Sequence, residues 1–79
     1  MESREREKIA RLYEIYEQPF YRIAYAVLKD REASEDAVHE AFVKLIRHVK
    51  RIGDPESEET KHYCVKVIRS CAISQYRSR

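Results

Sequence analysis

Apolar residues in the first third of the chain recur at alternating spacings of four and three, the period of a helix with one buried face. They are Ile9, Tyr13, Tyr16, Phe20, Ile23 and Val27. Pro19 falls inside this stripe, and a proline removes a backbone donor and clashes with the preceding turn. We therefore predict a first helix with a kink or a break near residues 17–19. If the helix breaks, Glu17 or Gln18 can cap a second segment that begins at Pro19.

Two further helical patterns follow. Asp30 is suited to cap the second helix, which should run to about Lys50. Its buried side is expected to use Ala37, Val38, Ala41, Leu45 and Val49. Residues 51–59 hold the sole Gly and the second Pro and are predicted to form a loop. Ser57, followed by acidic residues, suits the start of the last helix.

The last helix should carry its apolar residues on its inner faces. These are Tyr63, Val67, Cys64 or Ile68, Cys71, Ala72 and Tyr76. Strand-like alternation and internal repeats do not appear along the chain. The pattern therefore predicts an all-α fold, a compact three-helix bundle with its first helix kinked near Pro19.

Composition agrees with a small helical domain. The chain has 79 residues, of which 38% are charged and 43% hydrophobic, with one Gly and two Pro. These values indicate one domain, residues 1–79, and exclude a disordered or β-rich chain. No apolar run approaches the roughly 20 residues that span a bilayer, and no signal peptide is visible. We expect a cytoplasmic protein that does not associate with a membrane.

The cysteines and histidines do not form a metal-site pattern. Cys64 and Cys71 are seven residues apart, so on one helix their Cα atoms lie about 10 Å apart, beyond disulfide reach. His39, His48 and His62 are scattered, and Cys-x-x-Cys is absent. We interpret the cysteines as core residues. The chain also lacks a Gly-rich phosphate loop and a nucleophile–base spacing, so we expect neither an enzyme nor a cofactor.

Charge is sorted along the chain. Residues 32–60 contain eight acidic and four basic side chains, whereas residues 61–79 contain five basic side chains and no acid. Within the second helix the acids precede the bases, an order that helix-dipole stabilisation alone can explain. However, the acidic face continues into apolar residues, which favours a docking surface for a basic partner helix.

Three runs of the sequence carry a family resemblance. Residues 29–42, KDREASEDAVHEAF, resemble the GDREDAEDLVQEAF run in region 2.2 of bacterial sigma factors of the extracytoplasmic-function (ECF) group. Residues 63–77 resemble the WLYRIARNLAIDYLR run of regions 2.3 and 2.4. Residues 12–28 are similar to LYEKYYRRLYRLALRLL of region 2.1. The resemblance covers nearly the whole chain in the right order and identifies it as a member of this family.

The resemblance implies a transcription initiation factor domain with two partners. The second helix is expected to bind the RNA polymerase core at the clamp coiled coil of the beta-prime subunit. The matching positions are Glu35, Asp36, His39, Glu40, Phe42 and Ile46. The loop and the last helix are expected to recognise and melt the minus-ten promoter element and to bind its non-template single strand, often with one base flipped into a loop pocket. The DNA-binding positions are Lys61, His62, Tyr63, Lys66, Arg69, Ser70 and Arg77.

Some positions depart from the family pattern. His39 replaces the usual Gln, Ser70 an Asn and Ser74 an Asp, which leaves the promoter preference open. Tyr63 has an alternative role as a partly buried packing residue. The loop is acidic, so its carboxylates would repel DNA phosphates unless they point away from the DNA.

Other interpretations concern the whole chain. Region 4, the second domain of the family, does not follow Arg79, so we expect a fragment of a longer sigma factor, with a stand-alone region 2 protein as the alternative. An anti-sigma factor is a further possible partner. The alternative function is a small helical protein–protein interaction module without DNA binding.

Overall fold

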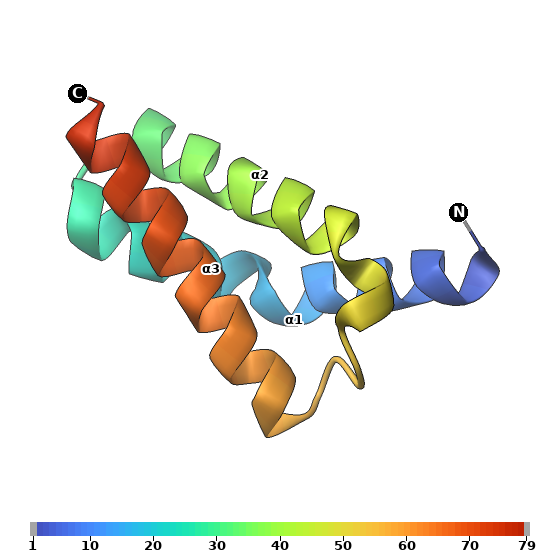
Figure 1. Ribbon diagram of the computed structural model, residues 1–79. Helices are drawn as coiled ribbons and strands as arrows, with labels where there is room; N and C mark the ends of the chain where they lie inside the picture. The colour runs from blue at the N-terminus through green and yellow to red at the C-terminus, as the bar shows by residue number, and fades with distance from the viewer. Residues whose placement is uncertain (1, 79) are drawn as a thin grey trace.

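The computed structural model describes residues 2–78, which form a helical bundle (Figure 1). In chain order its elements are α1 (Ser3–Leu28), α2 (Arg31–Arg47), the short 3-10 helix η1 (Val49–Arg51) and α3 (Glu58–Arg77). Each of the three long helices packs against the other two. This confirms the predicted all-α three-helix bundle.

Helix α1 is unbroken through Pro19, which excludes one of the two predicted alternatives, a break near residues 17–19. Tyr16 and Phe20 flank this position and are both buried. An interior proline costs about 3 kcal/mol, whereas burying one large apolar side chain contributes about 1.5–3 kcal/mol. Packing on both sides of Pro19 therefore offsets its cost. A kink in the continuous helix stays a prediction.

The buried face of α1 overlaps the predicted stripe at Tyr16 and Phe20 and departs from it toward both ends of the helix. Its members are Leu12, Tyr16, Phe20 and Ala24. Tyr13 and Val27, which we expected on the inner face, are 48% and 37% exposed. Steps of four along a helix drift by about 40° each, so the buried line turns gradually around α1. This drift lets one helix pack against both α2 and α3.

The turn between α1 and α2 follows its sequence signals. Lys29 adopts the left-handed conformation, with φ of 53°, and its N–H donates to the Tyr25 carbonyl at 2.9 Å. The Asp30 carboxylate accepts from the Ala33 N–H at 2.8 Å, which confirms the predicted cap. Ser34 is buried but donates its hydroxyl to the Asp30 carbonyl at 2.6 Å. The Ala33 N–H, the Ser34 hydroxyl and the Asp30 carboxylate at the start of α2 therefore all take part in hydrogen bonds.

Helix α2 ends at Arg47 rather than near Lys50, because the chain tightens into η1. The predicted positions Ala37, Ala41, Leu45 and Val49 are all buried, while Val38 is partly exposed. The Ile52 side chain, in the predicted loop, is also buried and joins the core. This burial holds the beginning of the loop against the bundle.

Helix α3 begins after Ser57, whose hydroxyl accepts from the Thr60 N–H at 3.2 Å, as predicted. Its buried residues are Thr60, Cys64, Val67, Ile68, Cys71 and Ala72. The expectation that Tyr76 is also buried is wrong, because its side chain is 64% exposed. The drift of the four-residue spacing carries it past the contact.

Cys64 and Cys71 are free and fully buried, as core residues should be. Burial raises the pKa of the Cys64 thiol to about 11 and also raises the pKa of Cys71. Within residues 2–78, no helix combines the length and the apolar character needed to cross a membrane.

Candidate functional site

The predicted polymerase-binding residues lie along the outer side of α2. Glu35, Asp36 and His39 are exposed, Glu40 is partly exposed and Ile46 is 39% exposed. These side chains are thus accessible to a partner. Their accessibility is compatible with the expected role.

Phe42 is placed differently, because its side chain is only 8% exposed. Its ring centroid lies 4.9 Å from that of Tyr13 and 5.1 Å from that of Phe20. Phe42 therefore packs between α1 and α2 beneath the exposed residues of α2. Its role in polymerase binding stays a prediction.

A hollow of about 490 Å³ lies between α1 and α2 beside this surface. Its lining consists of Tyr13, Glu17, Gln18, Tyr21, Arg31, Glu35, Val38, His39 and Phe42. Three predicted residues of α2 thus share a site with aromatic and acidic residues of α1. Sequence reasoning missed the α1 side, because Tyr13 was assigned to the core stripe. Glu17, one turn after Tyr13, raises the pKa of the Tyr13 hydroxyl, mainly through a side-chain hydrogen bond.

Glu40 lies on the other flank of α2. It pairs with Lys44 at 4.0 Å, and both side chains influence the pKa of Cys71 on α3. Glu35 instead pairs with Arg31 at 3.7 Å and lines the hollow against α1. The predicted face of α2 therefore has two flanks, one beside each neighbouring helix.

Helix α3 presents the predicted DNA-binding residues on its outer side. Lys61, His62, Lys66, Arg69, Ser70 and Arg77 are all exposed. Ile73 and Tyr76 are 44% and 64% exposed and add apolar surface beside these residues. The first turn of α3 carries Glu58 and Glu59, but its last four turns contain no acid, so this side of the helix is basic over those turns. Such a face suits a phosphate backbone.

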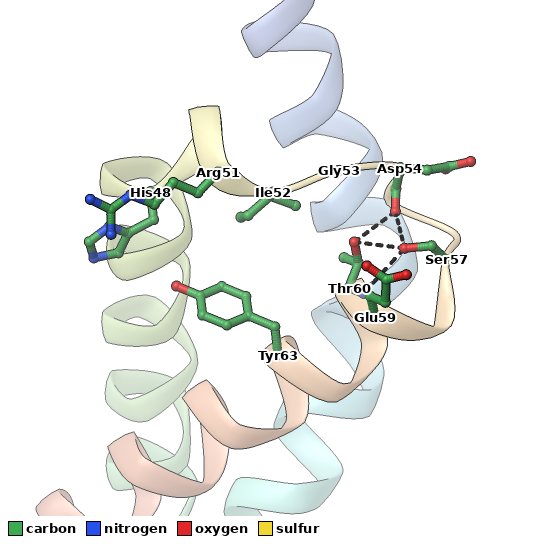
Figure 2. Close-up of a pocket in the computed structure, with 9 residues that line it drawn as sticks. All are labelled: His48, Arg51, Ile52, Gly53, Asp54, Ser57, Glu59, Thr60 and Tyr63. Atoms are coloured by element: carbon green, nitrogen blue, oxygen red, sulfur yellow. Dashed lines mark hydrogen bonds between the residues drawn. The ribbon is translucent and has the colours of Figure 1, made fainter.

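Tyr63 is partly buried and packs against the core, which confirms the packing interpretation. It also lines a second hollow, of about 680 Å³, beneath the loop between α2 and α3 (Figure 2). The other lining residues are His48, Arg51, Ile52, Gly53, Asp54, Ser57, Glu59 and Thr60. Figure 2 shows the Tyr63 ring extending from α3 toward the His48 and Arg51 side of this hollow.

The family resemblance implied a loop pocket for a flipped base, but most of the residues that line this second hollow were not predicted. Tyr63 is the one lining residue that the sequence placed in the DNA-binding set. His48 and Arg51 were missed, although Arg51 begins the predicted loop and His48 lies three residues before it. Their imidazole and guanidinium groups can donate hydrogen bonds to a base or a phosphate.

Asp54 organises the far end of the loop. Its carbonyl accepts from the Ser57 hydroxyl at 2.9 Å and from the Thr60 hydroxyl at 2.7 Å. Its carboxylate accepts from the Glu56 N–H at 2.9 Å. Glu56 itself pairs with Arg11 of α1 at 3.4 Å. Two of the loop's acids are therefore engaged within the protein, while Glu59 lines the hollow.

Within the part of the chain that the structure describes, no three His, Cys, Asp or Glu side chains gather where they could hold a metal ion. The two hollows are lined by aromatic, acidic and basic side chains instead. Their chemistry is that of binding surfaces.

The fold and these surfaces describe a small helical domain with exposed acids on α2 and exposed bases on α3. Residues 12–79 match the sigma-70 region 2 family. Because the match covers all but the first eleven residues, the chain belongs to this family, a non-enzymatic class of transcription initiation factor domains that bind RNA polymerase and recognise promoters. No curated protein and no solved structure matches the chain significantly.

Proposed function

We propose that this domain acts in the manner of the ECF group, with a different surface for each partner. Helix α2 binds the clamp coiled coil of the beta-prime subunit. The loop and α3 bind the non-template strand of the minus-ten element and help keep the promoter open. The observation that carries the proposal is the division of exposed charge: the predicted acids lie on α2, and the predicted bases lie on α3, whose residues 61–77 contain no acid.

The polymerase surface joins charge with an aromatic hollow. Asp36 and Glu40 lie one turn apart on α2 and complement a basic partner helix, which supports steering and register. Glu35 and His39 extend the surface into the hollow against α1. Arg or Lys side chains of a coiled coil can meet both carboxylates and aromatic faces there. This combination favours a basic helical partner over a purely apolar one.

The DNA surface combines a basic track with the second hollow. Lys66, Arg69 and Arg77 follow the exposed side of α3, where they can neutralise phosphates. Extruding one base costs a few kcal/mol, and stacking one base on an aromatic ring returns about 1–3 kcal/mol. Tyr63 packs against the core but also lines the loop hollow, where the rest of its ring can stack on a base. Stacking and phosphate contacts together supply binding energy for the unpaired strand, and this step needs no catalytic group.

Calorimetry with an isolated beta-prime clamp coiled coil tests the first surface. We expect micromolar binding by the wild type and its loss in the Asp36→Ala, Glu40→Ala double variant. Glu7→Ala, which removes an exposed acid from the first turns of α1, is the matched control and should bind as the wild type does. Absence of binding by a folded wild type would favour the interaction-module function with another partner.

Single-stranded DNA binding at several salt concentrations tests the second surface. Removing one phosphate contact by Arg69→Ala should weaken binding and reduce the salt slope by about 1. Arg22→Ala removes an exposed arginine from α1 and should change neither quantity. Wild-type binding that is absent or independent of salt would contradict the DNA-binding role and leave the protein-binding role standing.

A further inference from the structure

Two cations near the start of α1 reach the loop that covers the second hollow. The Lys8 ammonium donates to the backbone carbonyls of Val49, at 3.3 Å, and Ile52. Arg11 pairs with Glu56 at 3.4 Å. Figure 1 shows η1 beside the N-terminal half of α1, and these two elements are in contact. Both cations precede residue 12, where the family match begins.

The two contacts differ in strength. Val49 begins η1 and Ile52 directly follows its last residue, so the Lys8 ammonium joins the two ends of this short helix through their carbonyls. The Lys8 contacts are partly buried, and hydrogen bonds from a charged donor are roughly twice as strong as neutral ones. In the other pair, the Arg11 and Glu56 side chains are 46% and 65% exposed. Exposed ion pairs contribute little, so Lys8 is the principal contact.

Lys8 holds the end of the loop that has few other polar contacts. The far end is held by the hydrogen bonds of the Asp54 carbonyl to Ser57 and Thr60, drawn as dashed lines in Figure 2. The near end is held by the buried Ile52 side chain and by the Ile52 N–H, which donates to Val49 at 3.2 Å. The backbone between these ends forms the wall of the hollow opposite Tyr63.

We propose that Lys8 is a positioning residue for strand binding: by holding η1 and the first loop residues, it fixes the shape of the hollow that receives an unpaired base. The inference rests on the proposed DNA-binding function. It assigns a role in strand recognition to a part of α1 that lies outside the family match and does not itself line the hollow. Residues of α3 supply charge to the strand, whereas Lys8 acts through the loop.

The first test needs no DNA. Hydrogen exchange of the backbone amides in residues 50–57 is compared for wild type, Lys8→Met and Lys8→Arg. Loss of a charge-assisted contact should make these amides exchange about tenfold faster in Lys8→Met, with amides in the middle of α3 unchanged. Lys8→Arg should restore the wild-type rates. Arg4→Met, one turn earlier on the same helix and exposed, is the control. Unchanged loop exchange in Lys8→Met overturns the proposal.

The second test measures recognition of a base. The probe is an oligonucleotide selected from a random single-stranded pool, with an abasic sugar placed at each position in turn. The affinity of the wild type should fall when the abasic sugar replaces the captured base. Lys8→Met should bind the intact strand about five- to tenfold more weakly than the wild type. Its affinity should also depend less on whether that base is present. Lys8→Arg should recover the discrimination, and coiled-coil affinity should stay constant in all variants.

The two tests separate the possible failures. A wild type that shows no abasic effect contradicts base capture in the hollow, and with it the positioning role. A wild type that discriminates, together with a Lys8→Met variant that discriminates equally, overturns the role of Lys8 alone. Faster loop exchange with unchanged discrimination also overturns it, because the contact is then only structural.

Discussion

Tyr13 and Phe42 face each other across α1 and α2, with ring centroids 4.9 Å apart and ring planes tilted by 43°. Phe42 continues inward to Phe20, whose side chain is fully buried, while Tyr13 is 48% exposed. One aromatic chain thus runs from the centre of the bundle to the hollow beside Glu35 and His39. The polymerase surface that we propose is therefore built directly on the core.

The Phe42→Ala substitution should destabilise the bundle strongly. Truncation removes a buried ring and leaves a cavity between α1 and α2, which costs about 3–5 kcal/mol. Urea unfolding followed by circular dichroism measures this loss. Tyr76→Ala, at an exposed aromatic of α3, should change the unfolding free energy by less than about 0.5 kcal/mol. Equal stability of the two variants would contradict the assigned burial of Phe42.

Lys29→Gly should stabilise the domain. Lys29 has a left-handed backbone, which costs a non-glycine residue about 1–2 kcal/mol. Part of this gain is offset by the greater freedom of glycine in the unfolded chain, so we expect a net increase of about 0.5–1 kcal/mol. Thermal unfolding checks it, with Lys29→Ala as a control that keeps the strain. The family run quoted above has Gly at this position, in agreement with the geometry.

The His39→Lys substitution should weaken binding to the polymerase coiled coil, because His39 lines the hollow on the surface that we propose for a basic partner. A permanent positive charge at this hydrated surface should give about a threefold loss through repulsion. His39→Gln, which adds no charge, should keep the wild-type affinity in the same calorimetric titration. Equal affinities of the two variants would exclude His39 from the surface.

Stability should fall at alkaline pH because of the buried thiol. Burial raises the pKa of Cys64 from its ordinary 9.0 to about 11, so the folded protein keeps the proton that the unfolded chain releases. This contribution is complete below about pH 9 and is lost as pH rises toward 11. Unfolding free energies for wild type and Cys64→Ala, each referred to its value at pH 7, should therefore diverge between pH 9 and 11. Parallel curves would show that Cys64 ionises normally.

Local signals were sufficient for much of the architecture. Asp30 and Ser57 cap their helices as expected, because a cap depends on a side chain and the backbone two or three residues away. Cys64 and Cys71 were correctly placed in the core, since their spacing excluded a bridge within one helix. Hydrophobic periodicity correctly indicated the number and type of the helices.

The same periodicity located buried faces less well. Tyr13 and Tyr76 were expected inside and are exposed, whereas Phe42, which was not among the predicted core positions of α2, is buried. These positions lie near the edge of an apolar stripe, where a rotation of some 40° changes the environment. The crossing of neighbouring helices decides that rotation, and it depends on side chains far away in the sequence. Pro19 is a related case, because tertiary packing offset its local cost.

The sequence by itself determined the helical class, the caps, the sorting of charge and the family. Each of these depends on residue order or on contacts within one helical turn. Only the tertiary structure brought Lys8 to the carbonyls of Val49 and Ile52, and only it joined α1 to α2 around one hollow and the loop to α3 around another. Lys8 and Val49 are more than forty positions apart in the sequence, and no local pattern encodes a contact of this kind. Such contacts arise when burial of the shared core fixes the three helices against one another.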